Sequence, residues 1–118
     1  MTGPRFKILG GLDGTLDGHR LELSGPKQRW LLAMLLLNLN QFVSADRLAE
    51  ALWENEPPAS AEVTLRTHVS HLRRRLAAIG ASESLVTRRS GYSLMLDPEQ
   101  VDAYRFERLL FNRRLTSR

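Results

Sequence analysis

Cysteine is absent from the 118-residue sequence. Its absence excludes disulfides, thiol catalysis and cysteine-based metal sites, and it fits a reducing compartment. Long apolar runs are missing as well, because the longest, residues 30–37, has eight residues and a membrane-spanning helix needs about 20. We therefore expect one compact core in a protein of the cytoplasm that does not contact a membrane.

Acidic residues are missing from the stretch 63–79, although the whole chain has 13 of them. The wider stretch 61–89 has six arginines and two acids, an excess of four that equals the formal net charge of +4. Positive charge concentrated in this way is the electrostatic footprint of a nucleic-acid binder. A solvated basic face explains the charge equally well, so the charge alone leaves both interpretations open.

Catalytic motifs are also missing from the sequence. It shows no Ser-His-acid motif, no paired carboxylates and no metal-ligand spacing above chance. His68 and His71 are three residues apart and could share a helix face, but no third ligand accompanies them. We therefore predict neither an enzyme nor a metal centre, and we expect no cofactor.

The N-terminal part of the chain predicts a small antiparallel sheet of about three strands. Short alternating segments occur at residues 6–9 and 20–23, with residues 15–16 as a short middle strand. Asp-Gly pairs at 13–14 and 17–18 suit the tight turns between them, because glycine accepts a positive φ at low cost.

Two helices are predicted next. The first covers residues 27–38 after Pro26, and its apolar residues on nearly all sides predict a buried spine that includes Trp30. The second covers residues 45–53, and Ser44 is expected to cap its N-terminal N–H groups.

The third predicted helix, residues 60–79, is the longest, and Ser60 is expected to cap it. Its apolar residues recur at spacings of four, three, four and three, which places them in one stripe. They are Leu65, Val69, Leu72, Leu76 and Ile79. The opposite side carries hydroxyl, histidine and arginine side chains without carboxylates, a surface that suits a polyanion. This pattern predicts a DNA recognition helix.

A β-hairpin is predicted over residues 85–96, with its turn at Ser90-Gly91 and two arginines beside the tip. A last helix is predicted over residues 101–115. A bracing helix, a longer basic helix and a hairpin directly after it are arranged as in a winged helix-turn-helix. The fold class is therefore α+β, with a small N-terminal antiparallel sheet, a three-helix core and a C-terminal β-hairpin wing.

The chain resembles the OmpR/PhoB-type winged helix and, more closely, the DNA-binding domain of the Streptomyces antibiotic regulatory protein family. The matching stretches are FKILG, GPKQRWLLAMLLLN, FVSADRLAEALW, PPASA, LRTHVSHLRRRL and SGYSL. VDAYRFERLL resembles the opening of the bacterial transcriptional activation domain that follows in this family. The resemblance implies a DNA-binding domain over residues 1–97 and the start of an activation domain, a truncated helix, over residues 98–118.

The resemblance also implies which side chains read bases. They lie on the outer face of the third helix and are Arg66, Thr67, Ser70 and His71. An arginine such as Arg66 can make a forked contact with guanine O6 and N7. The Thr67 methyl can pack on a thymine methyl, and Ser70 or His71 can donate to acceptors on base edges.

A second set of residues is implied to bind phosphates, which fixes the register without reading sequence. The set consists of Thr64, His68, Arg73, Arg74, Thr87 and Arg88. On the wing, Arg89 corresponds to an arginine that enters the minor groove. Arg66 and Arg73 have alternative roles, because their stems can cover the core. They could also pair with Glu62 or Glu50.

The family implies an activator of secondary-metabolite (antibiotic) genes, an effector domain of the phosphorelay type. It would read direct repeats near the −35 region of promoters as a head-to-tail dimer on the bacterial nucleoid. Glu54 and Glu56, in the proline-containing loop before the third helix, are expected to contact RNA polymerase, through a sigma factor or the C-terminal domain of the alpha subunit. A plain connector explains that loop equally well. The competing function is a winged helix that contacts only proteins, which an acidic or apolar third helix would indicate.

Overall fold

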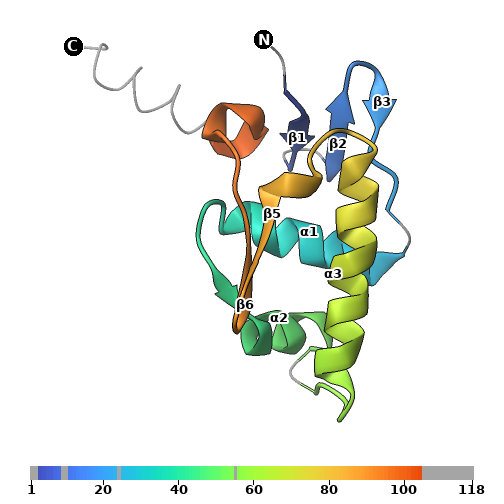
Figure 1. Ribbon diagram of the computed structural model, residues 1–118, viewed down its shortest axis with the longest axis vertical. Helices are drawn as coiled ribbons and strands as arrows, with labels where there is room; N and C mark the ends of the chain where they lie inside the picture. The colour runs from blue at the N-terminus through green and yellow to red at the C-terminus, as the bar shows by residue number, and fades with distance from the viewer. Residues whose placement is uncertain (1–2, 9–10, 24, 55, 105–118) are drawn as a thin grey trace, which may run out of the picture.

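The computed structural model describes residues 3–8, 11–23, 25–54 and 56–104, and it has three helices and two three-stranded sheets (Figure 1). The helices are α1 (Pro26–Leu37), α2 (Ala45–Leu52) and α3 (Ala61–Ala77). The strands are β1 (Arg5–Lys7), β2 (Asp13–Leu16), β3 (His19–Arg20), β4 (Val43–Ser44), β5 (Leu85–Arg88) and β6 (Gly91–Leu94). Short 3₁₀ turns, η1 (Ser82–Ser84) and η2 (Pro98–Gln100), precede β5 and follow β6. This arrangement confirms the predicted winged helix-turn-helix.

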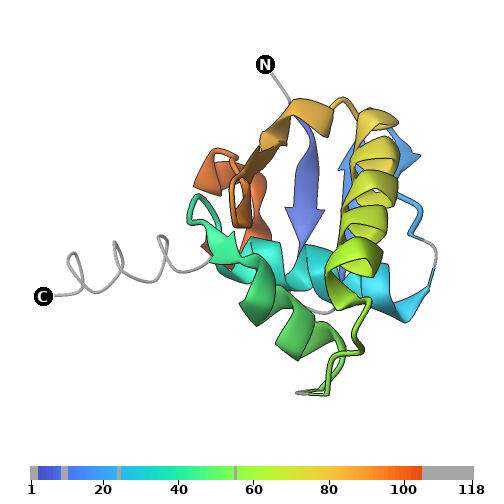
Figure 2. The ribbon, with the colours of Figure 1, turned by 60° about the horizontal axis from the view of Figure 1, so that its bottom comes forward.

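The core lies where the three helices and the β5–β6 hairpin meet (Figure 2). The stripe predicted on α3 is confirmed, because all five of its apolar residues are buried in this core. Burying side chains of this size contributes about 1.5–3 kcal/mol each, so the stripe holds α3 firmly against the domain. The other side of α3 is therefore free to present its polar residues to solvent.

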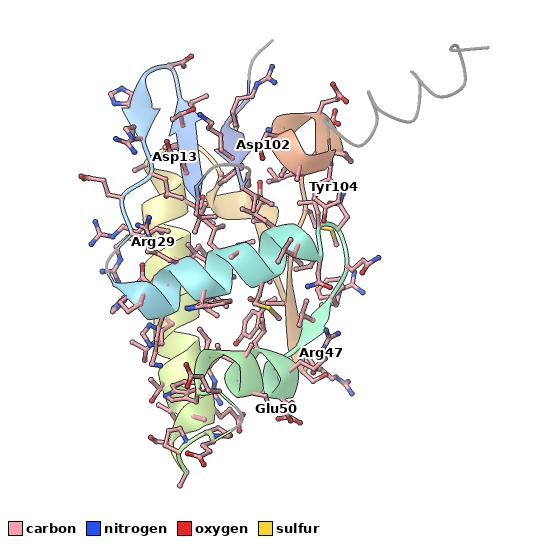
Figure 3. All side chains as sticks on the ribbon, turned by 180° about the vertical axis from the view of Figure 1, so that it is seen from behind. Asp13, Arg29, Arg47, Glu50, Asp102 and Tyr104 are labelled. Carbon is pink, nitrogen blue, oxygen red and sulfur yellow. The ribbon has the colours of Figure 1, made fainter. Side chains whose placement is uncertain are left out.

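Helix α1 departs from the prediction of a fully buried spine. Leu31, Leu32, Leu35 and Leu36 are buried, but Trp30 is 60% exposed, and so is Leu37. The reason is geometric: other elements cover one side of α1, and Trp30 and Leu37, seven residues apart, share the opposite side. In Figure 3, α1 crosses in front of the other elements. The prediction that Trp30 belongs to the core is therefore wrong.

The two predicted serine caps have different outcomes. The Oγ of Ser44 accepts the N–H of Arg47 at 3.1 Å, which confirms the cap of α2. Ser60 precedes α3 without a side-chain hydrogen bond to the helix, so that prediction is wrong. Its backbone (φ −91°, ψ 12°) departs from the extended conformation that directs a capping oxygen at the first turn.

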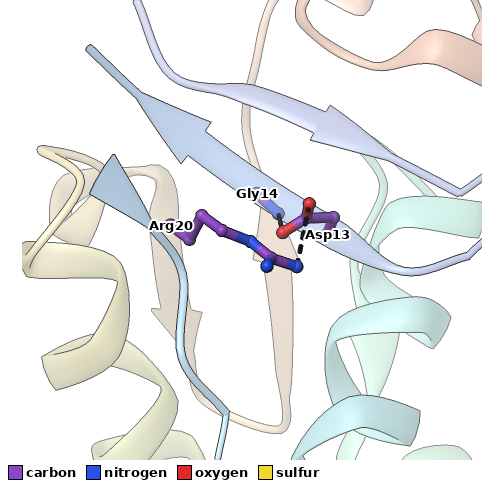
Figure 4. Close-up of polar contacts among 3 residues, drawn as sticks. All are labelled: Asp13, Gly14 and Arg20. Atoms are coloured by element: carbon purple, nitrogen blue, oxygen red, sulfur yellow. Dashed lines mark hydrogen bonds and ion pairs between the residues drawn. The ribbon is translucent and has the colours of Figure 1, made fainter. Parts of the chain in front are cut away.

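The N-terminal sheet has the order β1-β2-β3, which confirms the three predicted strands. The last of them is shorter and earlier than expected, because it covers residues 19–20 instead of 20–23. Asp13 stabilises the sheet in two ways: it accepts the N–H of Gly14 at 2.8 Å and pairs with Arg20 at 3.4 Å (Figure 4). Asp13 and Gly14 lie within β2 and do not form the predicted turn, and a Cβ on Gly14 would be in tight contact with the ring of Phe6, at 3.1 Å.

The second sheet, with the order β4-β6-β5, joins the wing to the helices. Strands β5 and β6 form the predicted hairpin, but its turn lies at residues 89–90, because Gly91 already belongs to β6. Strand β6 also pairs with β4 at the start of α2. Gly91 is required here, since a Cβ would lie 2.7 Å from the carbonyl oxygen of Val43. The N–H of Ala45 donates to Ser90 at 2.7 Å, which fixes the hairpin turn next to α2.

The segment after the wing packs back on the N-terminal half of the domain. Val101 is buried and bridges to Phe6 of β1, and Asp102 accepts the N–H of Ile8 at 2.7 Å. Tyr104 donates its hydroxyl to the carbonyl of Leu36 at 2.7 Å, at the end of α1 (Figure 3). The helix predicted over residues 101–115 lies outside the described residues after position 104, and the boundary between residues 97 and 98 stays a prediction. Within the described ranges, no helix has both the length and the apolar character to cross a membrane.

Candidate nucleic-acid interface

The outer face of α3 brings the four predicted base-reading residues together. Arg66, Thr67, Ser70 and His71 are all exposed, and all four line one shallow depression of about 510 Å³ between α3 and the wing. The predicted phosphate contacts Arg73, Arg74 and Thr87 line the same depression. The structure therefore gathers residues 21 positions apart into one surface, which we call the α3–wing face.

Arg66 forms an ion pair with Glu62, one helical turn earlier, at 3.2 Å. This is one of the alternatives that the sequence left open. Both side chains are about two-thirds exposed or more, and exposed pairs of this spacing contribute only about 0.3–0.5 kcal/mol. A forked contact with guanine discriminates by about 1–3 kcal/mol, so the ion pair is too weak to prevent it.

Arg73 connects α3 to the wing. Its Nη2 donates to the carbonyl of Leu85 at 3.1 Å and to the Oγ1 of Thr87 at 2.8 Å. The side chain is half-buried, in contrast to its exposed neighbour Arg74. In this conformation the guanidinium of Arg73 holds strand β5 against α3, and Arg74 extends into solvent.

Thr64 and His68 lie on the flank of α3 that is remote from the wing, and neither lines the α3–wing face. His68 is half-buried near Trp53, with their ring centres 6.5 Å apart, and its Nδ1 is buried without a hydrogen-bond partner. Burial lowers the pKa of His68, and the nearby His71 and Lys27 lower it further. We therefore expect a neutral ring at pH 7, which makes His68 a weaker phosphate ligand than an arginine.

The two wing arginines differ in their surroundings. Arg88 lies over the ring of Phe42, with its guanidinium carbon 4.6 Å from the ring centre. Arg89 is exposed at the hairpin turn. Both line a second depression, of about 720 Å³, which lies between α2, the start of α3 and the wing. Glu50 lines it as well, so this part of the surface carries mixed charge.

The loop between α2 and α3 presents its acids to solvent. Glu54 and Glu56 are both exposed, and Glu54 has a positive φ of 53°. The N–H of Glu56 donates to Trp53 at 3.0 Å, which gives the loop a defined turn. Neither acid lines the α3–wing face, so the loop forms a separate surface.

Sequence reasoning missed two residues of this surface. Val63 is 63% exposed and lines the α3–wing face, and Tyr92 of β6 lines it from the wing. The signal for Val63 was its position off the apolar stripe of α3, whereas nothing in the sequence placed Tyr92. Among the residues that the structure describes, no group of three or more histidines or acids could hold a metal ion.

Comparisons with known proteins show the family and the fold of the chain. Residues 18–94 match the family described as "Transcriptional regulatory protein, C terminal". The transcriptional regulatory protein MoaR1 of Mycobacterium tuberculosis is 46% identical over 105 residues, which cover 86% of this chain and 34% of MoaR1. The regulatory protein DnrI of Streptomyces peucetius is 35% identical over 112 residues, covering 89% of this chain and 41% of DnrI. The structure of Mycobacterium tuberculosis EmbR in complex with a low affinity phosphopeptide matches with a TM-score of 0.81 and 38% identity, over 87% of this chain and 28% of EmbR.

The fold and the family define a winged-helix DNA-binding domain of a transcriptional regulator, rather than an enzyme. The chain belongs to the OmpR/PhoB-type transcriptional regulatory family and, within it, to the Streptomyces antibiotic regulatory protein group, which confirms the resemblance seen in the sequence. The matched part of the chain covers 34% of the length of MoaR1 and 41% of that of DnrI.

Proposed function

We propose that the chain binds promoter DNA sequence-specifically, with α3 in the major groove and the β5–β6 hairpin in the minor groove. The observation that supports this most strongly is that all four expected base-reading residues line one surface next to the wing. The major groove, about 12 Å wide, admits an α-helix, and its base edges distinguish all four base pairs.

The wing supports the proposal through its charge. Arg89 is exposed at the turn of the hairpin, where it can enter a groove adjacent to the one that α3 occupies. A narrow A·T-rich minor groove has an enhanced negative potential that favours an inserted arginine. Thr87 and Arg74 line the same depression as the base-reading residues and would bind phosphates beside them.

The biological role that we propose is activation of secondary-metabolite genes in the bacterial cytoplasm. Two domains would bind head-to-tail on direct repeats near the −35 region. The exposed loop acids Glu54 and Glu56 would then contact a basic surface of RNA polymerase, on a sigma factor or the alpha subunit. Residues 98–118 would begin the activation domain that follows in longer relatives.

The test starts with selection of binding sites from random double-stranded DNA, followed by footprinting on the selected sequence. We expect an enriched motif, protected as two direct repeats on promoter DNA. Arg89→Ala should weaken binding and reduce the slope of log K against log salt by about one unit, because one cation fewer displaces counterions. Arg29→Ala is the matched control, since Arg29 is exposed on α1 and lines neither depression. Absence of any enriched motif would favour the protein-binding alternative.

The polymerase contact requires its own experiment. A Glu54→Ala/Glu56→Ala double variant should bind the selected DNA as the wild type does but fail to stimulate transcription in a reconstituted assay. A double variant that still activates would remove the loop from the proposal and leave it as a connector.

A further inference from the structure

Val63 is an exposed apolar side chain on a surface that is otherwise basic and hydroxylated. Four large apolar residues are exposed in the described part of the chain, and Val63, at 63%, is the most exposed of them. Those other residues, Trp30, Leu37 and Phe42, do not line the α3–wing face, whereas Val63 does. A valine exposed to this extent contributes little to the core and is available to a ligand of this face.

Thr67 adds a third methyl group beside the two of Val63. It follows Val63 by one helical turn, and residues four apart are neighbours on a helix surface. The hydroxyl of Thr67 donates to the carbonyl oxygen of Val63 at 3.2 Å, so its proton is committed to the helix backbone. What Thr67 offers to a ligand is therefore mainly its methyl group, adjacent to the two methyls of Val63. We call these two side chains the methyl pair.

We propose that the methyl pair reads the C5-methyl group of thymine, and that Val63 is a specificity-determining residue of the interface. The proposal rests on the function proposed above, in which α3 occupies the major groove. In that groove the thymine methyl is the apolar group that distinguishes bases, and apolar side chains contact it. Phosphates, the other ligands of this face, would gain nothing from a valine.

The surroundings of the methyl pair fit this role. Arg66 and Ser70 line the same depression and can bind polar base edges beside the thymine. The pair would thus select thymine at one or two positions within a site whose other bases are read by hydrogen bonds.

Deoxyuridine provides the test, because it differs from thymidine only by the missing methyl group. On the DNA selected by the wild-type protein, each thymine is replaced in turn by deoxyuridine and the affinity is measured. We expect a loss of about fourfold at one or two positions, as follows from removing one methyl contact.

Two variants then assign the effect to the methyl pair. Val63→Ala and Thr67→Ser each remove methyl groups while keeping the helix, and Thr67→Ser keeps the hydroxyl bond to the backbone. Each variant should bind thymine DNA less tightly and show a smaller deoxyuridine penalty at its own position. Trp30→Ala is the control for loss of an exposed apolar residue, and it should keep the full penalty.

The outcomes separate this inference from the function on which it rests. Failure of the wild-type protein to select any DNA would contradict the proposed function. Selection of DNA without a deoxyuridine penalty at any thymine would overturn only the methyl pair. A full penalty in both variants, or an equal weakening of Val63→Ala on thymine and deoxyuridine DNA, would overturn it as well.

Discussion

Helices α1 and α3 each have one side in the core and one side in solvent, but their outer sides differ in chemistry. The outer side of α1 carries Trp30 and Leu37, whereas that of α3 carries Arg66, Ser70 and Arg74. Apolar content therefore did not identify the inner side of α1, because both of its sides are apolar. On α3 the polar residues marked the solvent side, and their basic, hydroxylated composition indicates the interface that we propose.

The largest expected effect tests the inner side of α1. Leu35 is completely buried, and Leu35→Ala should lower the free energy of unfolding by about 2–5 kcal/mol, since it removes buried methyl groups and leaves a cavity. Urea denaturation followed by circular dichroism measures this. A loss below about 1 kcal/mol would mean that the packing of α1 differs from the structure described above.

Arg66→Ala tests the outer side of α3 and should leave the fold almost unchanged. On the selected DNA site it should cost about 1–3 kcal/mol of binding free energy and relax specificity at one base pair. Affinities for the selected site and for random DNA give the answer. Equal weakening on both would show that Arg66 contacts phosphate and does not read a base.

Helix α3 and its contacts also show what the sequence could and could not predict. The apolar stripe predicted helix α3 and its buried side, and the acid-free stretch around it indicates the interface that we propose. The bond between Arg73 and Thr87 joins residues 14 positions apart, and it depends on how closely the hairpin approaches α3. Ser60 failed as a cap for a similar reason, because its backbone conformation is set by the loop before it and not by its residue type. Local patterns predict elements, whereas contacts between elements require the packed structure.

Arg73 provides a test of the connection between α3 and the wing, with a smaller expected effect. Arg73→Lys keeps the charge, but the lysine nitrogen is one bond closer to Cα than Nη2 of arginine and reaches the two acceptors less well, so we expect a loss of about 0.5–1.5 kcal/mol in stability. Hydrogen exchange should become faster at the hairpin amides, and Thr87→Val should show the same change with a smaller amplitude. If Arg73→Lys leaves hairpin exchange unaltered but weakens DNA binding, Arg73 acts as a phosphate contact and does not position the wing.

The smallest effect is expected at Trp30, and it returns to the outer side of α1. Trp30→Gln removes a large aromatic group, but the ring is 60% exposed and the glutamine stem covers part of the same surface. Glutamine also has a better helix propensity than tryptophan, which offsets some of the lost contact. The two terms should leave the free energy of unfolding within about 0.5 kcal/mol of the wild type, as is usual for surface substitutions. Urea denaturation beside Leu35→Ala makes the comparison direct, and a loss at Trp30 close to that at Leu35 would show that this side of α1 is covered in solution.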